Sequence, residues 1–364
     1  MESQRGEEQC ANSEEPSPHP GGGFFFIFVC YNRSVMSNKN TTQQEHTTLY
    51  RKYRPNTFDE VMGQDHIVSA LQQAAESGKP AHAYLFSGSR GVGKTSIARI
   101  FARALGTSEN DIYEMDAASN TGVDNMRELS EAANTLPFNS KYKVYILDEV
   151  HMLSKSAFNA FLKTLEEPPR HVIFILATTE TNKVPETVIS RCQHFAFRTP
   201  TVEVLRQIIL HVAKSEKIKI ATEAVDLVAI LGDGSFRDTL GILQKVGDMA
   251  GGEITREAVE NITGSPRHVL VSEYVNGLLH KKPVEALDAL SKASVNNANL
   301  TIFADLALME VRSVIIVGIR SGAGEVLPIH LRKVLASLLN ARARLDSSSI
   351  QTLPLELAIL ETSE

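Results

Sequence analysis

Five short apolar runs alternate with helical stretches between residues 82 and 200, and this alternation constrains the fold more than any other feature of the sequence. Parallel strands need crossover connections, usually helices, and strands covered on both faces are nearly continuously apolar. The pattern therefore predicts an α/β domain built on a five-stranded parallel sheet. The expected strands are 82–88, 112–118, 143–150, 172–179 and 194–200, and the expected helices are 94–105, 123–136, 155–167 and 185–190.

Beyond residue 201 the strand pattern stops and the helical period takes over. The expected helices are 202–216, 221–231 and 235–249, followed by further helical segments with breaks at 264–266, 296–299 and 321–324. No internal repeat is visible. We therefore predict three folded domains, at 49–201, 202–249 and 250–364.

The first 48 residues differ in composition from the rest. Residues 1–23 are rich in Glu, Ser, Pro and Gly, and 34–48 are polar without periodicity. Neither stretch can bury enough apolar area to offset the entropy of ordering it. We expect 1–48 to be a disordered N-terminal extension and interpret Met36 as a candidate true start, with a genuine disordered tail as the alternative.

Composition excludes several classes of protein. With 37 Lys and Arg against 43 Asp and Glu, the net charge of −6 excludes a globally basic nucleic-acid coat but allows a local basic patch. The three cysteines form no CxxC pair, so neither a disulfide scaffold nor a four-cysteine zinc site is expected. The longest apolar run, 24–31, is too short to span a bilayer. These features favour a soluble, cytoplasmic protein with no membrane partner.

A glycine-rich phosphate loop follows the first expected strand and precedes a helix, which is the context that supports the G-x-x-x-x-G-K-[ST] motif. Its glycines let backbone N–H groups and the helix N-terminus point at phosphate oxygens. Lys94 supplies a charge for the β- and γ-phosphates of ATP, and the Thr95 hydroxyl can bind Mg²⁺. The expected nucleotide-binding residues are Gly88, Ser89, Arg90, Gly91, Val92, Gly93, Lys94, Thr95 and Ser96.

An apolar strand that ends in Asp148-Glu149 supplies the second half of the predicted site. Asp148 is the expected Mg²⁺ partner, directly or through water. Glu149 is the expected base that orients and deprotonates the attacking water. Together with the phosphate loop, this pair predicts an ATPase rather than a protein that only binds nucleotide.

Four further residues are candidates near the γ-phosphate. Thr178 and Thr179 end the fourth expected strand, where a hydroxyl could hold the lytic water. Arg191 follows a short helix, and Arg237 opens a helix of the second domain. Either arginine could supply positive charge, and a finger contributed by a neighbouring subunit raises the rate by about 10³–10⁵.

These motifs resemble the AAA+ clamp-loader ATPases, and most closely the gamma/tau subunits of bacterial DNA polymerase III. The similarity is dense over about 49–250 and extends to 250–364 only in helical character. The motifs that carry it are 53–58 (YRPNTF), 61–64 (VMGQ), 88–95, 116–120 (DAASN), 147–153 (LDEVHML), 159–169 (NAFLKTLEEPP), 177–180 (ATTE), 190–192 (SRC) and 234–238 (GSFRD).

The resemblance implies a RecA-like AAA+ domain, a three-helix lid and a C-terminal helical collar that assembles subunits into a ring of five. It places Val61 and Met62 beside the adenine of ATP. It makes Thr179 the sensor, with the preceding threonine as the alternative. It assigns Arg191 as the finger that reaches the neighbour's ATP, and Arg237 as the lid sensor of the γ-phosphate.

The resemblance also implies partners: delta and delta-prime type subunits, the sliding clamp (beta) and primed DNA, which the segment 119–121 would face. The expected function is ATP-dependent loading of the clamp onto primed DNA. Relatives usually carry a cysteine zinc module between the first helix and the second strand, but the connection 104–111 has no cysteine, so no zinc is expected. The sequence also ends before a tau-type tail, which led us to expect a short, gamma-like product or a fragment.

Two other readings remain open. Another AAA+ DNA-processing ATPase, involved in branch migration or recombination, would share the phosphate loop and the Asp148-Glu149 pair. A structural ring subunit with a relic site is the non-enzymatic alternative. No polymerase active site is predicted, because we find no metal-binding carboxylate set beyond the one that serves ATP.

Overall fold

The computed structural model describes residues 47–320 and 329–363. Nearly all of the expected N-terminal extension, Met36 included, and the expected break at 321–324 therefore lie outside the described residues. The described residues all belong to the unit of the chain that begins at Thr47.

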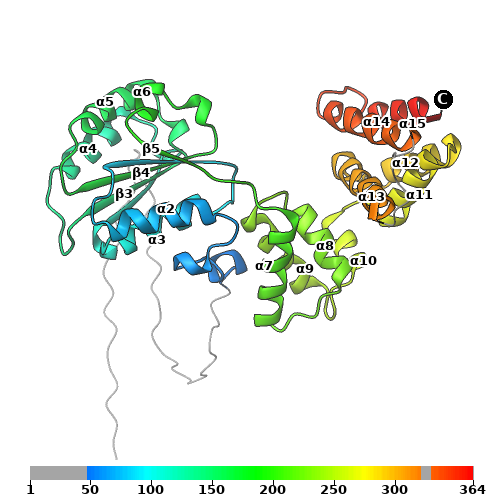
Figure 1. The fold of residues 1–364 in the computed structure, drawn as a ribbon, viewed down its shortest axis with the longest axis horizontal. Coiled ribbons are helices and arrows are strands. Elements are labelled where there is room, and N and C mark those ends of the chain that lie inside the picture. The colour runs from blue at the N-terminus through cyan, green and yellow to red at the C-terminus, as the bar shows by residue number, and fades with distance from the viewer. Residues whose placement is uncertain (1–46, 321–328, 364) are drawn as a thin grey trace, which may run out of the picture. The chain divides into compact units, whose positions relative to one another are not determined.

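Five parallel strands form the sheet, in the order β2-β3-β4-β1-β5 (Figure 1). This confirms the predicted five-stranded parallel sheet. The strands are β1 (Ala83–Ser87), β2 (Ile112–Asp116), β3 (Lys143–Asp148), β4 (Val172–Thr178) and β5 (Gln193–Ala196). The helices of this part are α1 (Leu49–Lys52), α2 (Asp65–Glu76), α3 (Lys94–Ala104), α4 (Val123–Ala133), α5 (Lys155–Glu166) and α6 (Glu186–Ile189). Four 3₁₀ turns join them: η1 (Phe58–Glu60), η2 (Glu109–Asp111), η3 (Val150–Met152) and η4 (Thr181–Lys183).

Helices cover both faces of the sheet because successive side chains of a strand point to opposite sides. Tyr84 and Phe86 of β1 pack with α2 and α3, whereas Leu85 between them packs with α4 and α5. The three inner strands β1, β3 and β4 are buried along nearly their whole length. The edge strands β2 and β5 are largely exposed, so the expectation of strands covered on both faces holds only for the inner three.

The phosphate loop leaves the sheet at the carboxyl end of β1, next to the end of β4, where the N–H of Gly88 donates to the carbonyl of Thr178. Ligands of open α/β sheets bind at this edge, where strand order reverses. Gly88 has a φ of 146°, and a Cβ there would lie 2.9 Å from the Cβ and carbonyl oxygen of Phe197. Only glycine therefore lets the loop pass this close to the chain after β5.

After β5 the described residues form helices joined by short connections, two of which pair in a parallel β-bridge between Ile220 and Ile254. Thr201 and Ser235 cap helices with their side-chain oxygens, and the break at 232–234 holds Asp233 and Gly234 in the left-handed region. The helices are α7 (Val202–Ser215), α8 (Thr222–Leu231), α9 (Phe236–Met249), α10 (Arg256–Thr263), α11 (His268–Leu279), α12 (Pro283–Val295), α13 (Leu300–Arg320), α14 (Ile329–Leu345) and α15 (Leu353–Ser363).

The buried side chains of these helices, from Leu205 in α7 to Ile359 in α15, belong to one apolar cluster, which also takes in Leu49 of α1. The expected domain limits at 201 and 249 thus remain predictions. None of the described helices is both long and apolar enough to cross a membrane.

Candidate nucleotide site

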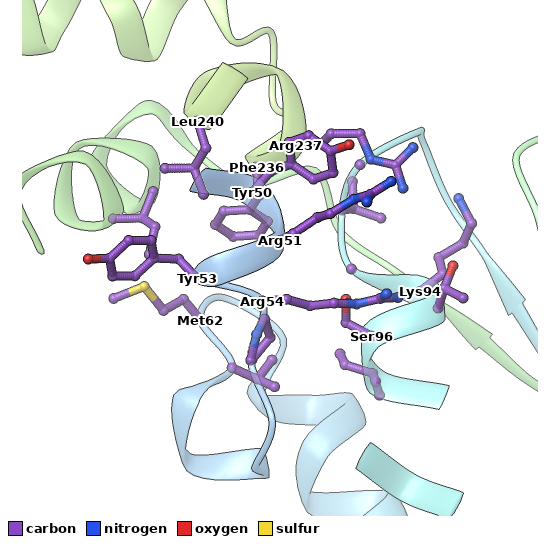
Figure 2. Close-up of a pocket in the computed structure, with 18 of the residues that line it drawn as sticks. Tyr50, Arg51, Tyr53, Arg54, Met62, Lys94, Ser96, Phe236, Arg237 and Leu240 are labelled. Atoms are coloured by element: carbon purple, nitrogen blue, oxygen red, sulfur yellow. The ribbon is translucent and has the colours of Figure 1, made fainter. Parts of the chain in front are cut away.

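A pocket of about 400 Å³ lies where four parts of the chain meet: the segment 50–62, the phosphate loop with the start of α3, the end of β3, and helices α7 and α9 (Figure 2). It is lined by Tyr50, Arg51, Tyr53, Arg54, Pro55, Glu60, Val61, Met62, Arg90, Gly91, Val92, Gly93, Lys94, Thr95, Ser96, Ile97, Asp148, Glu149, Ile208, Phe236, Arg237 and Leu240. Most of the predicted site residues therefore share one cavity.

Lys94 opens α3, and its side chain folds back over the phosphate loop. Its ammonium donates to the carbonyl oxygens of Gly88, at 2.8 Å, and Ser89, at 2.9 Å. Burial lowers the pKa of Lys94, while the carboxylates of Glu149 and Asp148 act in the opposite direction. A phosphate group in the loop would add negative charge and favour the charged lysine.

Thr95 and Asp148 meet where α3 begins and β3 ends. The Thr95 hydroxyl donates to Asp148 Oδ2 at 2.7 Å, and Asp148 Oδ1 accepts the N–H of Glu149 at 3.0 Å. A hydroxyl and a carboxylate side by side are oxygen ligands of the type that Mg²⁺ takes together with water and substrate phosphates. These two residues therefore fit the predicted Mg²⁺ site.

Glu149 follows β3 in a left-handed conformation, with a φ of 49°. Such a backbone is uncommon for a residue with a side chain and is enriched at functional sites. Its carboxylate is 30% exposed and accepts a hydrogen bond from the Thr179 hydroxyl at 3.1 Å. Thr179, which does not itself line the pocket, thus contacts the predicted base, whereas Thr178 is fully buried behind it.

The N-terminus of α9 is bonded directly to the phosphate loop. The N–H of Phe236 donates to the carbonyl of Gly91 at 3.0 Å. Gly91 has a φ of 74°, and a Cβ there would lie 2.0 Å from the Ser235 hydroxyl. The next residue, Arg237, enters the pocket with its guanidinium 5.8 Å from the centre of the Tyr50 ring.

The other end of the pocket is apolar. Val61 and Met62 line it as expected, together with Tyr53, Ile208 and Leu240. A purine ring is flat and largely apolar, so these side chains suit one.

Three contributions to this pocket were not predicted: Tyr50, Arg51 and the side chain of Ile208 in α7. Arg54, within a motif that resembled the family, donates from Nε to the Ser96 hydroxyl at 2.8 Å, and burial lowers its pKa. Figure 2 shows this side chain directed toward the start of α3.

Arg191 lies outside the pocket. Its guanidinium donates to Glu166 Oε1 at 2.7 Å and to the carbonyl of Thr187 at 2.8 Å, and its side chain is 34% exposed. Two expected phosphate-loop residues, Gly88 and Ser89, also do not line the cavity, although their carbonyl groups hold Lys94.

Comparison with known proteins gives a consistent family. The family model described as "DNA polymerase III, delta subunit" matches residues 63–122 and 108–201. The chain is 41% identical over 265 residues to DNA polymerase III subunit tau of Bacillus subtilis, covering 67% of this chain and 47% of that protein. It is 42% identical over 238 residues to the Escherichia coli tau subunit, covering 60% and 37%. The chain thus spans about half, or less, of the length of these relatives.

Solved structures agree on the fold. The Thermotoga maritima RuvB Holliday junction branch migration motor is similar with a TM-score of 0.50 at 22% identity, over 62% of this chain and 79% of that one. A mutant of the same protein gives a TM-score of 0.50 at 24% identity, over 58% and 73%. Identity this low supports a shared AAA+ architecture and no more. The chain is therefore related to the gamma/tau subunits of bacterial DNA polymerase III and has an AAA+ ATPase fold.

Proposed function

We propose that this protein hydrolyses ATP as a motor subunit of a clamp loader, which places the sliding clamp on primed DNA. The observation that carries the proposal is the pocket, which joins Lys94, the Thr95–Asp148 pair, Glu149 and Arg237. The 41–42% identity to polymerase III subunits points to replication as the setting.

Each residue around the phosphates has one task. Lys94 binds the β- and γ-phosphates, and the hydroxyl of Thr95 and carboxylate of Asp148 hold Mg²⁺, which neutralises charge on the phosphates. Glu149 orients the attacking water in line with the γ-phosphate and accepts a proton from that water. Val61 and Met62 contact the adenine ring.

The helical part of the chain couples the nucleotide to assembly. Arg237 sits at the start of α9, which is bonded to the loop at Gly91, so a γ-phosphate that attracts this arginine would also fix α9. We assign 202–249 as the lid and 250–364 as the collar of a ring with delta and delta-prime type subunits in the cytoplasm. Primed DNA would pass the segment 119–121.

Arg191 is proposed to act on the ATP of a neighbouring subunit. It contributes nothing to its own pocket, yet it is partly exposed and held by a single carboxylate, Glu166. An arginine that moves from this carboxylate to a γ-phosphate would keep an anionic partner throughout.

A second candidate is an AAA+ motor that acts on other DNA structures, because the solved neighbours are a branch migration motor. Their likeness concerns the fold alone. The much higher identity to polymerase III subunits favours the clamp loader.

The test is steady-state ATP hydrolysis by the full chain with delta-type subunits, clamp and primed DNA. We expect clamp and primed DNA to stimulate hydrolysis strongly, and Lys94→Ala and Arg191→Ala to lower it by about 10² and 10³-fold. Arg103→Ala is the matched control, because Arg103 pairs with Glu109 on the surface as Arg191 pairs with Glu166. Hydrolysis indifferent to the clamp and retained in Arg191→Ala would favour the second candidate.

A further inference from the structure

His151 lies two residues beyond the proposed base, in the 3₁₀ turn η3 that follows it. Its side chain is only 8% exposed. The roles proposed above leave this imidazole without a task, although it is a buried titratable group beside the pocket.

Polar groups surround both nitrogens of the ring. Nδ1 is 3.2 Å from the Thr178 hydroxyl and 3.4 Å from Glu149 Oε2. Nε2 is 3.5 Å from Glu180 Oε1. The imidazole therefore lies between two carboxylates, one in the pocket and one outside it.

The far side of the ring is itself held in place. Glu180 forms an ion pair with Lys183 at 2.8 Å, and this hydrogen bond lowers the pKa of Glu180. The N–H of Glu180 donates to the Thr178 hydroxyl oxygen at 3.0 Å, and the second lone pair of that oxygen can accept an N–H from the ring. The end of β4 and the turn after it thus fix the position of His151.

The side-chain contacts of the Glu149 carboxylate are all made to one of its two oxygens. The Thr179 hydroxyl and His151 Nδ1 both approach Oε2, whereas Oε1 has no hydrogen-bond partner among the described residues. An N–H at Nδ1 can bond the Thr178 hydroxyl oxygen, and it then lies beside Oε2, to which its positive end is attracted. One carboxylate oxygen therefore has two side-chain neighbours, and the other has no side-chain partner in the described part of the chain.

We propose that His151 is a positioning residue for hydrolysis: backed by Glu180 and Thr178, it holds Glu149 Oε2 so that Oε1 meets the attacking water. The inference rests on the proposed ATPase function and adds to it the residue that orients the base. A base displaced by about 1 Å can lose 10²-fold in rate, so the constraint acts on turnover rather than on nucleotide binding.

The test compares single-turnover hydrolysis at saturating ATP in His151→Phe and His151→Asn, with the partner subunits, clamp and primed DNA present. Phenylalanine fills the site but offers no N–H, whereas asparagine places an amide near the position of Nδ1. We expect His151→Phe to lower the hydrolysis rate about 10- to 100-fold and His151→Asn to recover part of the loss. Affinity for a fluorescent ADP analogue stays unchanged in both. His66→Asn, on the exposed face of α2, is the control.

Two results would overturn the inference: a wild-type rate in His151→Phe, or a loss of nucleotide affinity as large as the loss of rate. If His151→Phe does not fold, Glu180→Gln decides, because this partly exposed residue acts through the same ring. A severalfold lower rate in Glu180→Gln supports the inference, and a wild-type rate contradicts it. Glu149→Gln distinguishes a failure of the proposed function from a failure of the inference about His151. If the Glu149→Gln variant hydrolyses ATP at the wild-type rate, the assignment of Glu149 as the base is wrong, whatever the result at His151.

Discussion

The pocket has an excess of positive side chains, whereas the whole chain has a negative net charge. Five cationic side chains line it, against three acidic ones, although the chain carries a net charge of −6. A polyphosphate neutralises such an excess, and the low dielectric of a cleft strengthens the attraction. The cationic residues are Arg51, Arg54, Arg90, Lys94 and Arg237.

Asp111, at the end of η2, is a buried carboxylate whose partners are backbone N–H groups. It accepts hydrogen bonds from the N–H of Phe138 at 2.5 Å and of Asn139 at 2.9 Å. Burial alone would raise its pKa, but these bonds and those from Ser140 and Ser108 outweigh burial and lower the pKa to about 2. The charged form therefore stabilises the folded protein and ties the loop before β3 to the start of β2.

We predict that Asp111→Asn lowers the free energy of unfolding by about 2 kcal/mol at pH 7, the equivalent of the shift in pKa. Because the folded pKa is depressed, this stability is present above the ordinary pKa of about 4 and is lost as pH falls toward 2. Urea unfolding at pH 7 and at pH 3 measures it. The difference between wild type and variant should be smaller at pH 3, and a difference that grows with acid would contradict the prediction.

At the scale of elements, the sequence predicts those helices and strands whose limits depend on residues close together in the chain. The inner strands and α3 to α9 appear within a few residues of their expected limits, because apolar period and turn residues specify them. The short helix α1 and the helix α2 were not predicted, although α2 buries Ile67 and Leu71 at a helical spacing. The N–H of Leu49 in α1 bonds Gln244 Oε1 in α9, 195 residues away, and no local pattern contains that contact.

The residues of the candidate site also fall into two groups, those that the sequence predicts and those that it does not. Phosphate-loop and strand-end residues are recognisable because their chemistry depends on neighbours in the chain. Tyr50 and His151 were not predicted as site residues, since each contributes to the site only through contacts with side chains on other elements. Sequence spacing alone could not place an aromatic ring of α1 beside an arginine of α9.

α1 is expected to couple α7 and α9 to the pocket, because the Tyr50 ring lies beside the guanidinium of Arg237 in α9, and Tyr53, directly after α1, donates to Glu216, directly after α7. We predict that Tyr50→Leu lowers ATP hydrolysis about threefold, in line with a cation–π contact of about 0.5–1 kcal/mol. Tyr142→Leu removes a similar contact with Lys141 away from the pocket and is the control. Equal rates in Tyr50→Leu and wild type, measured at saturating ATP, would show that α1 does not act on Arg237.

At the scale of the whole molecule, the proposed function requires that the nucleotide site of one subunit be completed by Arg191 of a neighbouring subunit. Lys94 lines the pocket and Arg191 lies outside it, so a subunit with Lys94→Ala still offers an intact finger, and one with Arg191→Ala still has an intact pocket. If the finger acts between subunits, an Arg191→Ala pocket regains catalysis when its neighbour is the Lys94→Ala variant. If it acts within one subunit, no arrangement of the two variants gives a complete site.

We therefore predict complementation on mixing. Loader complexes assembled from either variant alone should hydrolyse ATP at least about 10²-fold more slowly than wild type, whereas complexes assembled from an equal mixture should recover a substantial fraction of the wild-type rate. A mixture of Lys94→Ala with an Arg191→Ala, Lys94→Ala double variant is the control, since it contains no intact pocket. Size-exclusion chromatography confirms equal assembly in every mixture, so a mixture as slow as its components would mean that Arg191 does not act on the neighbouring site.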